Sequence, residues 1–204
     1  MVTTLDAAGA RAWVERFLDA AETEAGALGE LDRLAGDGDF GASVTALVRG
    51  ARHALRDDPP KRPAAAFAAL STACLGIGGT SGPLYGMFFR ALAQRAGDAP
   101  TLDRAALADG VQAGVAAVRR LGGATVGERT MVDALQPAAD AMAMDGALTD
   151  ALDAAARAAR TGADETAGLL ARRGRATYVG EAALGVVDPG AALVAVFFEA
   201  ARAR

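Results

Sequence analysis

The chain has 204 residues, of which 52% are hydrophobic and 5% aromatic, so its apolar content is mostly alanine, leucine and valine. This mixture favours closely packed helices over sheet, and the length suits one domain. A net charge of −4 without a long basic run argues against nucleic acid as the main partner, and a single cysteine excludes a disulfide framework. Without a signal-like leader or a long apolar span, a cytoplasmic protein with no membrane segment is expected.

Helical periodicity runs through almost every segment between turn signals. Trp13, Phe17 and Ala21 recur four residues apart, and a second apolar stripe from Val44 to Leu55 ends before Pro59. Further helices are predicted over 63–76, 81–96, 103–121, 131–142, 149–172 and 190–203. No stretch alternates well enough to predict a strand. We therefore expect one all-α domain over 1–204, with about eight antiparallel amphipathic helices that could close into a ring with their loops at one rim.

The segment Asp37-Gly-Asp-Phe-Gly41, with Asp32 shortly before it, carries the strongest chemical signal. Three carboxylates beside flexible glycines repel one another unless a cation lies between them, and Mg²⁺ is bound by a few carboxylates together with substrate phosphates. The pattern indicates a metal-bridged phosphate site. A capped turn or a solvated acidic face would explain the same residues. A calcium-binding hand is excluded because Gly41 and Val48 stand where it needs an acidic or amide residue and a glutamate.

Three more clusters contain glycines. The segment Gly76-Ile-Gly-Gly-Thr-Ser-Gly-Pro83 could bind phosphate through its backbone and hydroxyls, or could let two helices cross closely. The loop that ends at Met131 could place this side chain against a purine ring or in the core. Arg175 could bind a phosphate or complement a helix dipole. Asp188-Pro-Gly-Ala191 is an orthodox helix start.

Side chains for covalent catalysis are scarce. The one histidine, His53, is predicted to lie in solvent, and Cys74 is predicted to lie in the core. No histidine therefore stands beside a serine or cysteine nucleophile. A hydrolytic triad and a zinc site are therefore not expected. Phosphoryl transfer requires mainly positioning and neutralisation of charge, which acidic metal ligands, glycine loops and an arginine can supply.

Four motifs stand in a fixed order along the chain. They are Leu31-Asp-Arg-Leu-Ala-Gly-Asp-Gly-Asp-Phe-Gly41, Gly78-Gly-Thr-Ser-Gly-Pro-Leu-Tyr-Gly86, Gly127-Glu-Arg-Thr-Met-Val-Asp-Ala-Leu135, and Gly174-Arg-Ala-Thr-Tyr-Val-Gly-Glu181 followed by Asp188-Pro-Gly190. Together they resemble the nucleotide-binding L subunit of dihydroxyacetone kinase, from about residue 10 to the C-terminus. The resemblance implies an eight-helix barrel that holds ADP or ATP through two Mg²⁺ ions at one rim.

The resemblance also implies a role for each matching residue. The Mg²⁺ ligands would be Asp32, Asp37 and Asp39. The nucleotide pocket would be formed by Phe40, Gly41, Ala42, Ser43, Thr80, Ser81, Gly122, Met131, Arg175, Asp188, Pro189 and Gly190. Within this set, the residues from Gly41 to Ser43 would line the phosphates and Met131 would flank the adenine. Asp133 and Glu181 match the motifs but are expected to be structural.

The chain departs from the family pattern at three places. Phe40 replaces a histidine, Ala42 and Ser43 replace residues that are commonly Asn or Thr, and Glu128-Arg129 replaces Asp-Lys. Because the three aspartates are kept, we expect nucleotide binding to persist. The identity of the sugar is left open by these changes.

The expected activity is transfer of phosphate from a Mg-nucleotide to a short-chain ketose such as dihydroxyacetone, a reaction of glycerol metabolism. The resemblance implies that a K-type partner subunit holds the ketose and supplies the acceptor-side catalytic groups, so this chain has none of its own. A phosphoenolpyruvate-dependent phosphotransferase protein could recharge bound ADP, or free ATP could exchange in a two-subunit kinase for another triose or tetrose. A nucleotide-sensing regulatory module, a purely structural helical protein and a homodimer all stay open.

Overall fold

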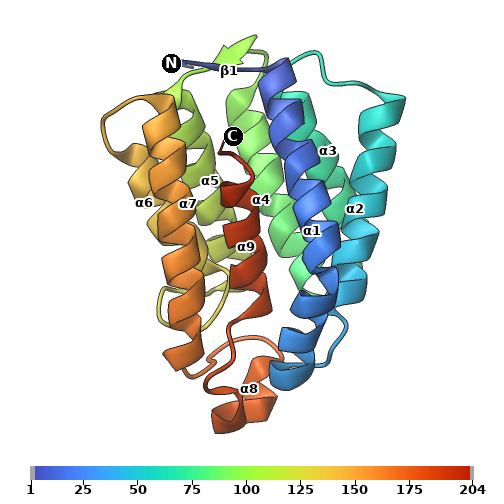
Figure 1. Cartoon of the computed structure of the whole chain (residues 1–204), viewed down its shortest axis with the longest axis vertical. Helices are drawn as coiled ribbons and strands as arrows, with labels where there is room; N and C mark the ends of the chain where they lie inside the picture. The colour runs from blue at the N-terminus through green and yellow to red at the C-terminus, as the bar shows by residue number, and fades with distance from the viewer. Residues whose placement is uncertain (1–2, 203–204) are drawn as a thin grey trace.

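The computed structural model describes residues 3–202, and these are almost entirely helical (Figure 1). The long helices are α1 (Ala7–Ala35), α2 (Phe40–Asp57), α3 (Pro63–Leu75), α4 (Ser81–Ala96), α5 (Arg104–Gly122), α6 (Val132–Ala143), α7 (Leu148–Glu165) and α9 (Pro189–Glu199). Between α7 and α9 lie the 3₁₀ turn Thr166–Gly168, the short helix α8 (Ala176–Val179) and the 3₁₀ turn Gly180–Ala183. None of the helices within 3–202 combines the length and apolar character that a bilayer crossing requires. The all-α prediction is confirmed.

The long helices form a closed ring. Each contacts the next along the chain, and α9 completes the ring by packing against both α7 and α1. Because successive long helices run alternately up and down, the connections α1–α2, α3–α4, α5–α6 and α7–α9 share one end of the barrel, at the bottom of Figure 1. We call these connections, residues 36–39, 76–80, 123–131 and 166–188, the loop rim. The predicted glycine-rich clusters all begin or end there.

A short pair of strands lies at the opposite end, where no strand was predicted. β1 (Leu5–Asp6) runs antiparallel to β2 (Thr101–Leu102), with Leu5 opposite Leu102. Two residues per strand are too few to produce a visible alternation in the sequence.

Two predicted helix boundaries were wrong. The helix predicted over 149–172 ends at Glu165, where the Thr166 hydroxyl donates to the Ala163 carbonyl and accepts from the Asp188 amide. This threonine therefore joins the end of α7 to the start of α9. The helix predicted over 190–203 ends at Glu199, and its last position lies outside the described residues. The four-residue helix α8 was not predicted.

Aromatic side chains concentrate around Phe197 in the middle of the barrel. Its ring stacks on Trp13 at a centroid distance of 4.7 Å and makes edge contacts with Phe17, Phe88 and Phe89 at 5.4, 6.0 and 5.1 Å. The Trp13 indole also donates to the Phe197 carbonyl at 2.7 Å. Each aromatic pair adds about 0.5–1.5 kcal/mol beyond the apolar area that it buries. This cluster ties α9 to α1 and α4 and so fixes the frame that carries the loop rim.

Glycines allow α1 and α2 to approach closely beside the rim. A Cβ placed on Gly41 would lie 2.6 Å from the Ala25 carbonyl oxygen and 3.1 Å from the Gly29 Cα. No side chain fits in that space. The first turn of α2 is therefore held directly against α1, next to Asp32.

Replacing Gly41 by alanine is expected to destabilise the fold by about 1–3 kcal/mol, since the added methyl group overpacks this crossing. Gly26→Ala is the matched control, because a Cβ on Gly26 meets no atom within 4 Å. The control should gain up to about 1 kcal/mol from helix propensity. Urea unfolding followed by circular dichroism measures both values, and equal stabilities of the two variants would contradict the close crossing.

Candidate nucleotide and metal site

Three aspartates from the end of α1 and the following loop come together at the loop rim. Asp32, Asp37 and Asp39 each offer a carboxylate oxygen, and these oxygens lie within 4.8 Å of one another. Asp32 is buried and the other two are exposed. A Cβ on Gly36 would stand 2.2 Å from Asp32 Oδ1, so glycine is required where the chain turns past this carboxylate.

The hydrogen bonds around this cluster support the capped-turn alternative for one aspartate only. Asp39 immediately precedes α2, but its side chain makes no capping bond. Instead Asp32 Oδ2 accepts from the Phe40 amide at 3.0 Å, across eight residues. One carboxylate thus satisfies the start of α2, while the other two have no such local role.

Burial and crowding of charge raise the pKa of Asp32. Burial is the main cause, the charges of Asp37 and Asp39 add to it, and the hydrogen bonds from the Phe40 and Gly38 amides oppose it. An acid whose pKa is raised on folding lowers the free energy of unfolding at pH values above its ordinary pKa. This loss of stability disappears as the pH falls below that ordinary pKa. At neutral pH the cluster therefore disfavours the folded chain, and a cation between the carboxylates would remove the penalty.

The aspartates border a cavity of about 270 Å³, which is near the small end for ligand sites. All four connections of the loop rim contribute to its lining. The predicted site residues that line it are Asp32, Asp37, Asp39, Phe40, Ser43, Thr80, Ser81, Gly122, Met131, Arg175, Asp188, Pro189 and Gly190. Segments up to about 150 residues apart in the sequence thus meet in one place, as the ring arrangement predicts.

Two predicted site residues lie outside this lining. Gly41 faces α1, and the absence of its side chain serves the helix crossing rather than the cavity. Ala42 is exposed on the first turn of α2. The phosphate-lining role that the sequence resemblance gave to these two residues stays a prediction.

The glycine-rich loop before α4 combines the two alternatives that the sequence left open. Gly78 and Gly79 have no atom within 4 Å of an added Cβ, and they line the cavity together with Thr80. Gly82 and Gly86 serve packing instead, because added Cβ atoms would lie 2.7 Å from the Ile77 carbonyl oxygen and 2.6 Å from the Leu75 side chain. The first half of the loop is open to a ligand, and the second half lets α4 approach α3.

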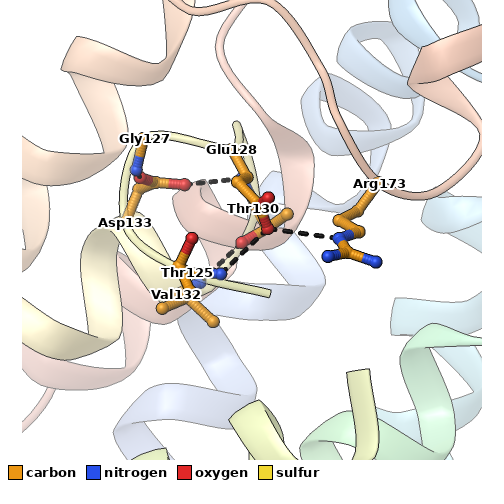
Figure 2. A network of polar contacts seen from close by, with 7 residues as sticks. All are labelled: Thr125, Gly127, Glu128, Thr130, Val132, Asp133 and Arg173. Atoms are coloured by element: carbon orange, nitrogen blue, oxygen red, sulfur yellow. Dashed lines mark hydrogen bonds and ion pairs between the residues drawn. The ribbon is translucent and has the colours of Figure 1, made fainter. Parts of the chain in front are cut away.

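Two buried or half-buried carboxylates hold the loop before α6. Asp133 is 4% exposed and accepts from the amides of Gly127 and Thr130 (Figure 2). Glu128 accepts from the Thr125 amide at 2.9 Å and from Arg173 Nε at 3.2 Å. These bonds fix the loop from within and link it to the segment before α8. Such contacts agree with the expected structural role of Asp133.

Met131 follows directly after this loop. Its side chain is 5% exposed and belongs to the hydrophobic core, yet it also lines the cavity. Met131 is therefore a core residue whose surface forms part of the cavity wall, and its contact with a purine ring stays a prediction.

Arg175 reaches the acidic cluster. It stands before the four-residue helix α8, far from the end of α7, so the helix-dipole alternative was wrong. Its Nε lies 2.8 Å from Asp37 Oδ2, and its side chain remains 62% exposed. Glu181, the other motif residue of this segment, is exposed and does not line the cavity.

Asp188 caps α9, as its sequence pattern predicts. Its Oδ2 accepts from the Ala191 amide at 2.8 Å. Burial raises the pKa of Asp188 to about 6, with the Ala191 amide and the Arg129 charge acting in the opposite direction and Asp133 and Asp32 adding to the rise. The Tyr85 hydroxyl donates to the Gly190 carbonyl and ties this end of α9 to α4.

Several lining residues are absent from the predicted site, Tyr85 and Arg129 among them. Tyr85 lies four residues after Ser81, so helical spacing alone places both on one face of α4 and could have found it. Arg129 lies in a polar loop sequence, and nothing in that sequence signals that its side chain is 1% exposed.

A larger, open groove of about 700 Å³ lies away from the rim, between α3 and α4. It contains Lys61, Arg62 and Arg90, and Arg62 is paired with Asp98 at its edge. This groove gathers neither clustered carboxylates nor open glycine loops. The smaller rim cavity is therefore the candidate site.

An all-helical barrel with three convergent carboxylates and open glycine loops at one rim defines the class of protein to which the chain is compared. Comparison with known proteins supplies the family: residues 34–203 match the DAK2 domain model. The chain belongs to the DAK2 domain family, and the resemblance predicted from the four motifs is confirmed.

Relatives of two lengths match the chain. It is 32% identical to the "PEP-dependent dihydroxyacetone kinase 1, ADP-binding subunit DhaL" of Listeria innocua, over 97% of this chain and 96% of that protein. It is 35% identical to the "PTS-dependent dihydroxyacetone kinase, ADP-binding subunit DhaL" of Lactococcus lactis, over 92% of each. It is 38% identical to the "L-erythrulose 1-kinase" of Mycolicibacterium smegmatis, over 92% of this chain but only 34% of that protein.

A solved structure has the same fold. The crystal structure of the dihydroxyacetone kinase from C. freundii in complex with AMP-PNP and Mg²⁺ superposes with a TM-score of 0.73 at 31% identity, covering 93% of this chain and 32% of that one. The chain therefore spans about a third of the longer kinases that it resembles and nearly all of the two DhaL subunits. These relatives are named as kinases or kinase subunits, in agreement with the phosphotransferase class that the motifs predict.

Proposed function

We propose that this chain is the nucleotide-binding subunit of a kinase that phosphorylates a short-chain ketose such as dihydroxyacetone. The observation that carries the proposal is the meeting of Asp32, Asp37 and Asp39 with the open half of the glycine loop around one cavity. Two DhaL subunits that match nearly end to end are named as ADP-binding, which supports ADP or ATP as the ligand.

The residues at the cavity fit a hard divalent cation. Asp32, Asp37 and Asp39 supply only oxygen donors, and no histidine or cysteine of the described residues lines the cavity. This donor set suits Mg²⁺ rather than zinc. Burial raises the pKa of Asp32, the charges of Asp37 and Asp39 add to the rise, and a bound cation would favour the charged carboxylates. We propose that these aspartates hold two Mg²⁺ ions, which when bound would neutralise charge on the nucleotide phosphates.

The remaining residues of the cavity would bind and orient the nucleotide. The open backbone at Gly78 and Gly79 and the hydroxyls of Thr80 and Ser81 offer donors to phosphate oxygens, and Arg175 offers a guanidinium. Met131, on the core side of the cavity, gives an apolar surface for a base. Phosphoryl transfer gains most of its rate from such positioning and charge neutralisation, and no nucleophile of this chain is needed.

The acceptor side of the reaction would come from another polypeptide. The DhaL relatives that match nearly end to end are named as subunits, and the longer relatives contain about twice as much additional chain. We therefore propose a K-type subunit that binds the ketose and docks at the loop rim. A cytoplasmic location belongs to the same proposal.

Calorimetry with ADP tests nucleotide binding directly. The proposal expects tight binding with Mg²⁺ and none in excess EDTA, and mass analysis of the native protein should find co-purified ADP. Absence of binding in the presence of Mg²⁺ would favour a structural helical protein instead.

Reconstitution tests the reaction and its phosphate donor. Mixing this chain with a K-type subunit and dihydroxyacetone should yield triose phosphate when phosphoenolpyruvate and phosphotransferase proteins recharge the bound ADP. Turnover with free ATP alone would rule out that donor and favour the ATP-exchanging kinase. Nucleotide binding without product from either donor would favour a sensing module.

A further inference from the structure

Arg129 combines three features that each lower the stability of the folded chain. Its side chain is 1% exposed, its Nε and Nη1 are buried without a hydrogen-bond partner in the described structure, and its backbone has a φ of 60°. It is the one residue other than glycine with a positive φ within 3–202. Strained backbone and an incompletely bonded buried charge persist where the surroundings enforce them, often at functional sites.

The loop that carries Arg129 is built to hold it in this conformation. Asp133 accepts from the amides on both sides of it, at Gly127 and Thr130, and Glu128 is anchored by the Thr125 amide and Arg173 (Figure 2). The left-handed backbone of Arg129 lies between these anchors. The guanidinium is thereby directed inward from the loop rather than toward solvent.

The guanidinium connects this loop to the segment before α9. Its Nη2 donates to the Val186 carbonyl at 2.8 Å and to the Ala183 carbonyl at 3.2 Å. Both carbonyls lie within five residues of Asp188, and Arg129, Asp188 and Gly190 all line the cavity. The positive charge also acts on the Asp188 carboxylate, which caps α9.

We propose that Arg129 is a positioning residue for nucleotide binding: its two carbonyl bonds hold the 183–186 turn, and its charge keeps Asp188 as the carboxylate that shapes the 188–190 wall of the cavity. The proposal rests on the proposed nucleotide function of this cavity. Arg129 need not touch the nucleotide itself, because it acts through the 188–190 wall of the cavity.

A pH dependence follows from the charges around Asp188. Burial raises the pKa of Asp188 to about 6, Asp133 and Asp32 act in the same direction, and Arg129 acts against it. Tyr85, which faces Asp188 from α4, has a pKa well above its ordinary value and stays neutral. Protonated Asp188 is a weaker acceptor for the Ala191 amide, so ADP affinity should be full above this pKa and fall as the pH drops through it. Without the Arg129 charge, the pKa of Asp188 should rise further, and the loss of ADP affinity should begin at a higher pH.

Calorimetric titration of ADP at saturating Mg²⁺, across about pH 5.5 to 9, separates charge from packing. Arg129→Gln should lower ADP affinity by about tenfold at pH 7 and move the midpoint of the pH profile to a higher pH. The difference in ADP affinity between this variant and the wild-type protein should become smaller toward high pH. Arg129→Lys keeps the charge and should keep the wild-type midpoint, with a lower affinity from its poorer carbonyl bonds. In an Asp188→Asn background, Arg129→Gln should no longer change the shape of the profile.

Each other outcome overturns the inference. Equal losses for the glutamine and lysine variants at every pH would make Arg129 a packing residue only, and unchanged affinity in both would remove its role. If Arg129→Gln loses its helical circular dichroism, Arg129→Lys decides, because a shifted midpoint or an unchanged affinity in that variant contradicts the proposal. Failure of the wild-type protein to bind ADP would instead refute the proposed function.

Discussion

Replacing Asp37 by alanine is expected to abolish Mg²⁺-dependent ADP binding while leaving the helical content unchanged. Asp37 would hold the metal, and without it the two remaining carboxylates could not balance the metal and phosphate charges. The fold should not suffer, because the ion pair that Asp37 makes with Arg175 is largely exposed, and exposed pairs contribute only about 0–1 kcal/mol. The loss of ADP affinity should be about 100-fold or more, since an ionic interaction with a metal exceeds one charge-assisted hydrogen bond.

The stability of this variant provides a second readout. The charge of Asp37 raises the pKa of Asp32, so removing it relieves part of the penalty that the cluster imposes at neutral pH. In EDTA, Asp37→Ala should therefore melt at the same temperature as the wild-type protein or slightly higher. Asp57→Ala, at the far end of α2, removes the same charge from an exposed pair with His53 and should leave ADP binding intact. Retained ADP binding in Asp37→Ala would refute the metal assignment, and loss of helicity would show that Asp37 is structural.

The helices of the barrel can be predicted from the sequence because their apolar residues recur with helical periodicity. Apolar residues four apart in α1 and α2 define one buried face per helix, and short glycine loops between long helices require antiparallel neighbours. The two-residue strands and α8 lack any such period, since each is shorter than the pattern that would reveal it. The end of α7 was missed because Thr166 stops it through a contact with Asp188, 22 residues away.

The candidate site is only partly visible in the sequence. Carboxylates and glycines are recognised by residue type, so Asp37 and Gly78 could be identified without coordinates. The residues that they contact could not be identified in this way. The sequence does not reveal that Gly41 packs on α1 or that Arg129 is buried, because burial depends on a neighbouring segment that is distant along the chain.

Replacing Arg175 by glutamine is expected to change metal and nucleotide affinity in opposite directions. In the structure Arg175 Nε lies 2.8 Å from Asp37 Oδ2, so its charge occupies the position of a counter-ion to a proposed metal ligand. A cation that binds the aspartates alone must compete with this pair. Without the guanidinium, Mg²⁺ should bind the nucleotide-free protein about twofold to fivefold more tightly, in proportion to the 0–1 kcal/mol of an exposed pair.

With ADP present, the same substitution should weaken binding by about tenfold to 100-fold, because the phosphates lose a charge-assisted donor that contributes about 1.5–3 kcal/mol. Arg172→Gln, three residues earlier on the exposed surface and outside the cavity lining, makes the same change of charge and should affect neither affinity. Calorimetry with Mg²⁺ alone and then with ADP at saturating Mg²⁺ gives both constants. A fall in both affinities would mean that Arg175 only organises the loop. A rise in metal affinity without any loss of ADP affinity would mean that the arginine leaves Asp37 but does not reach the phosphates.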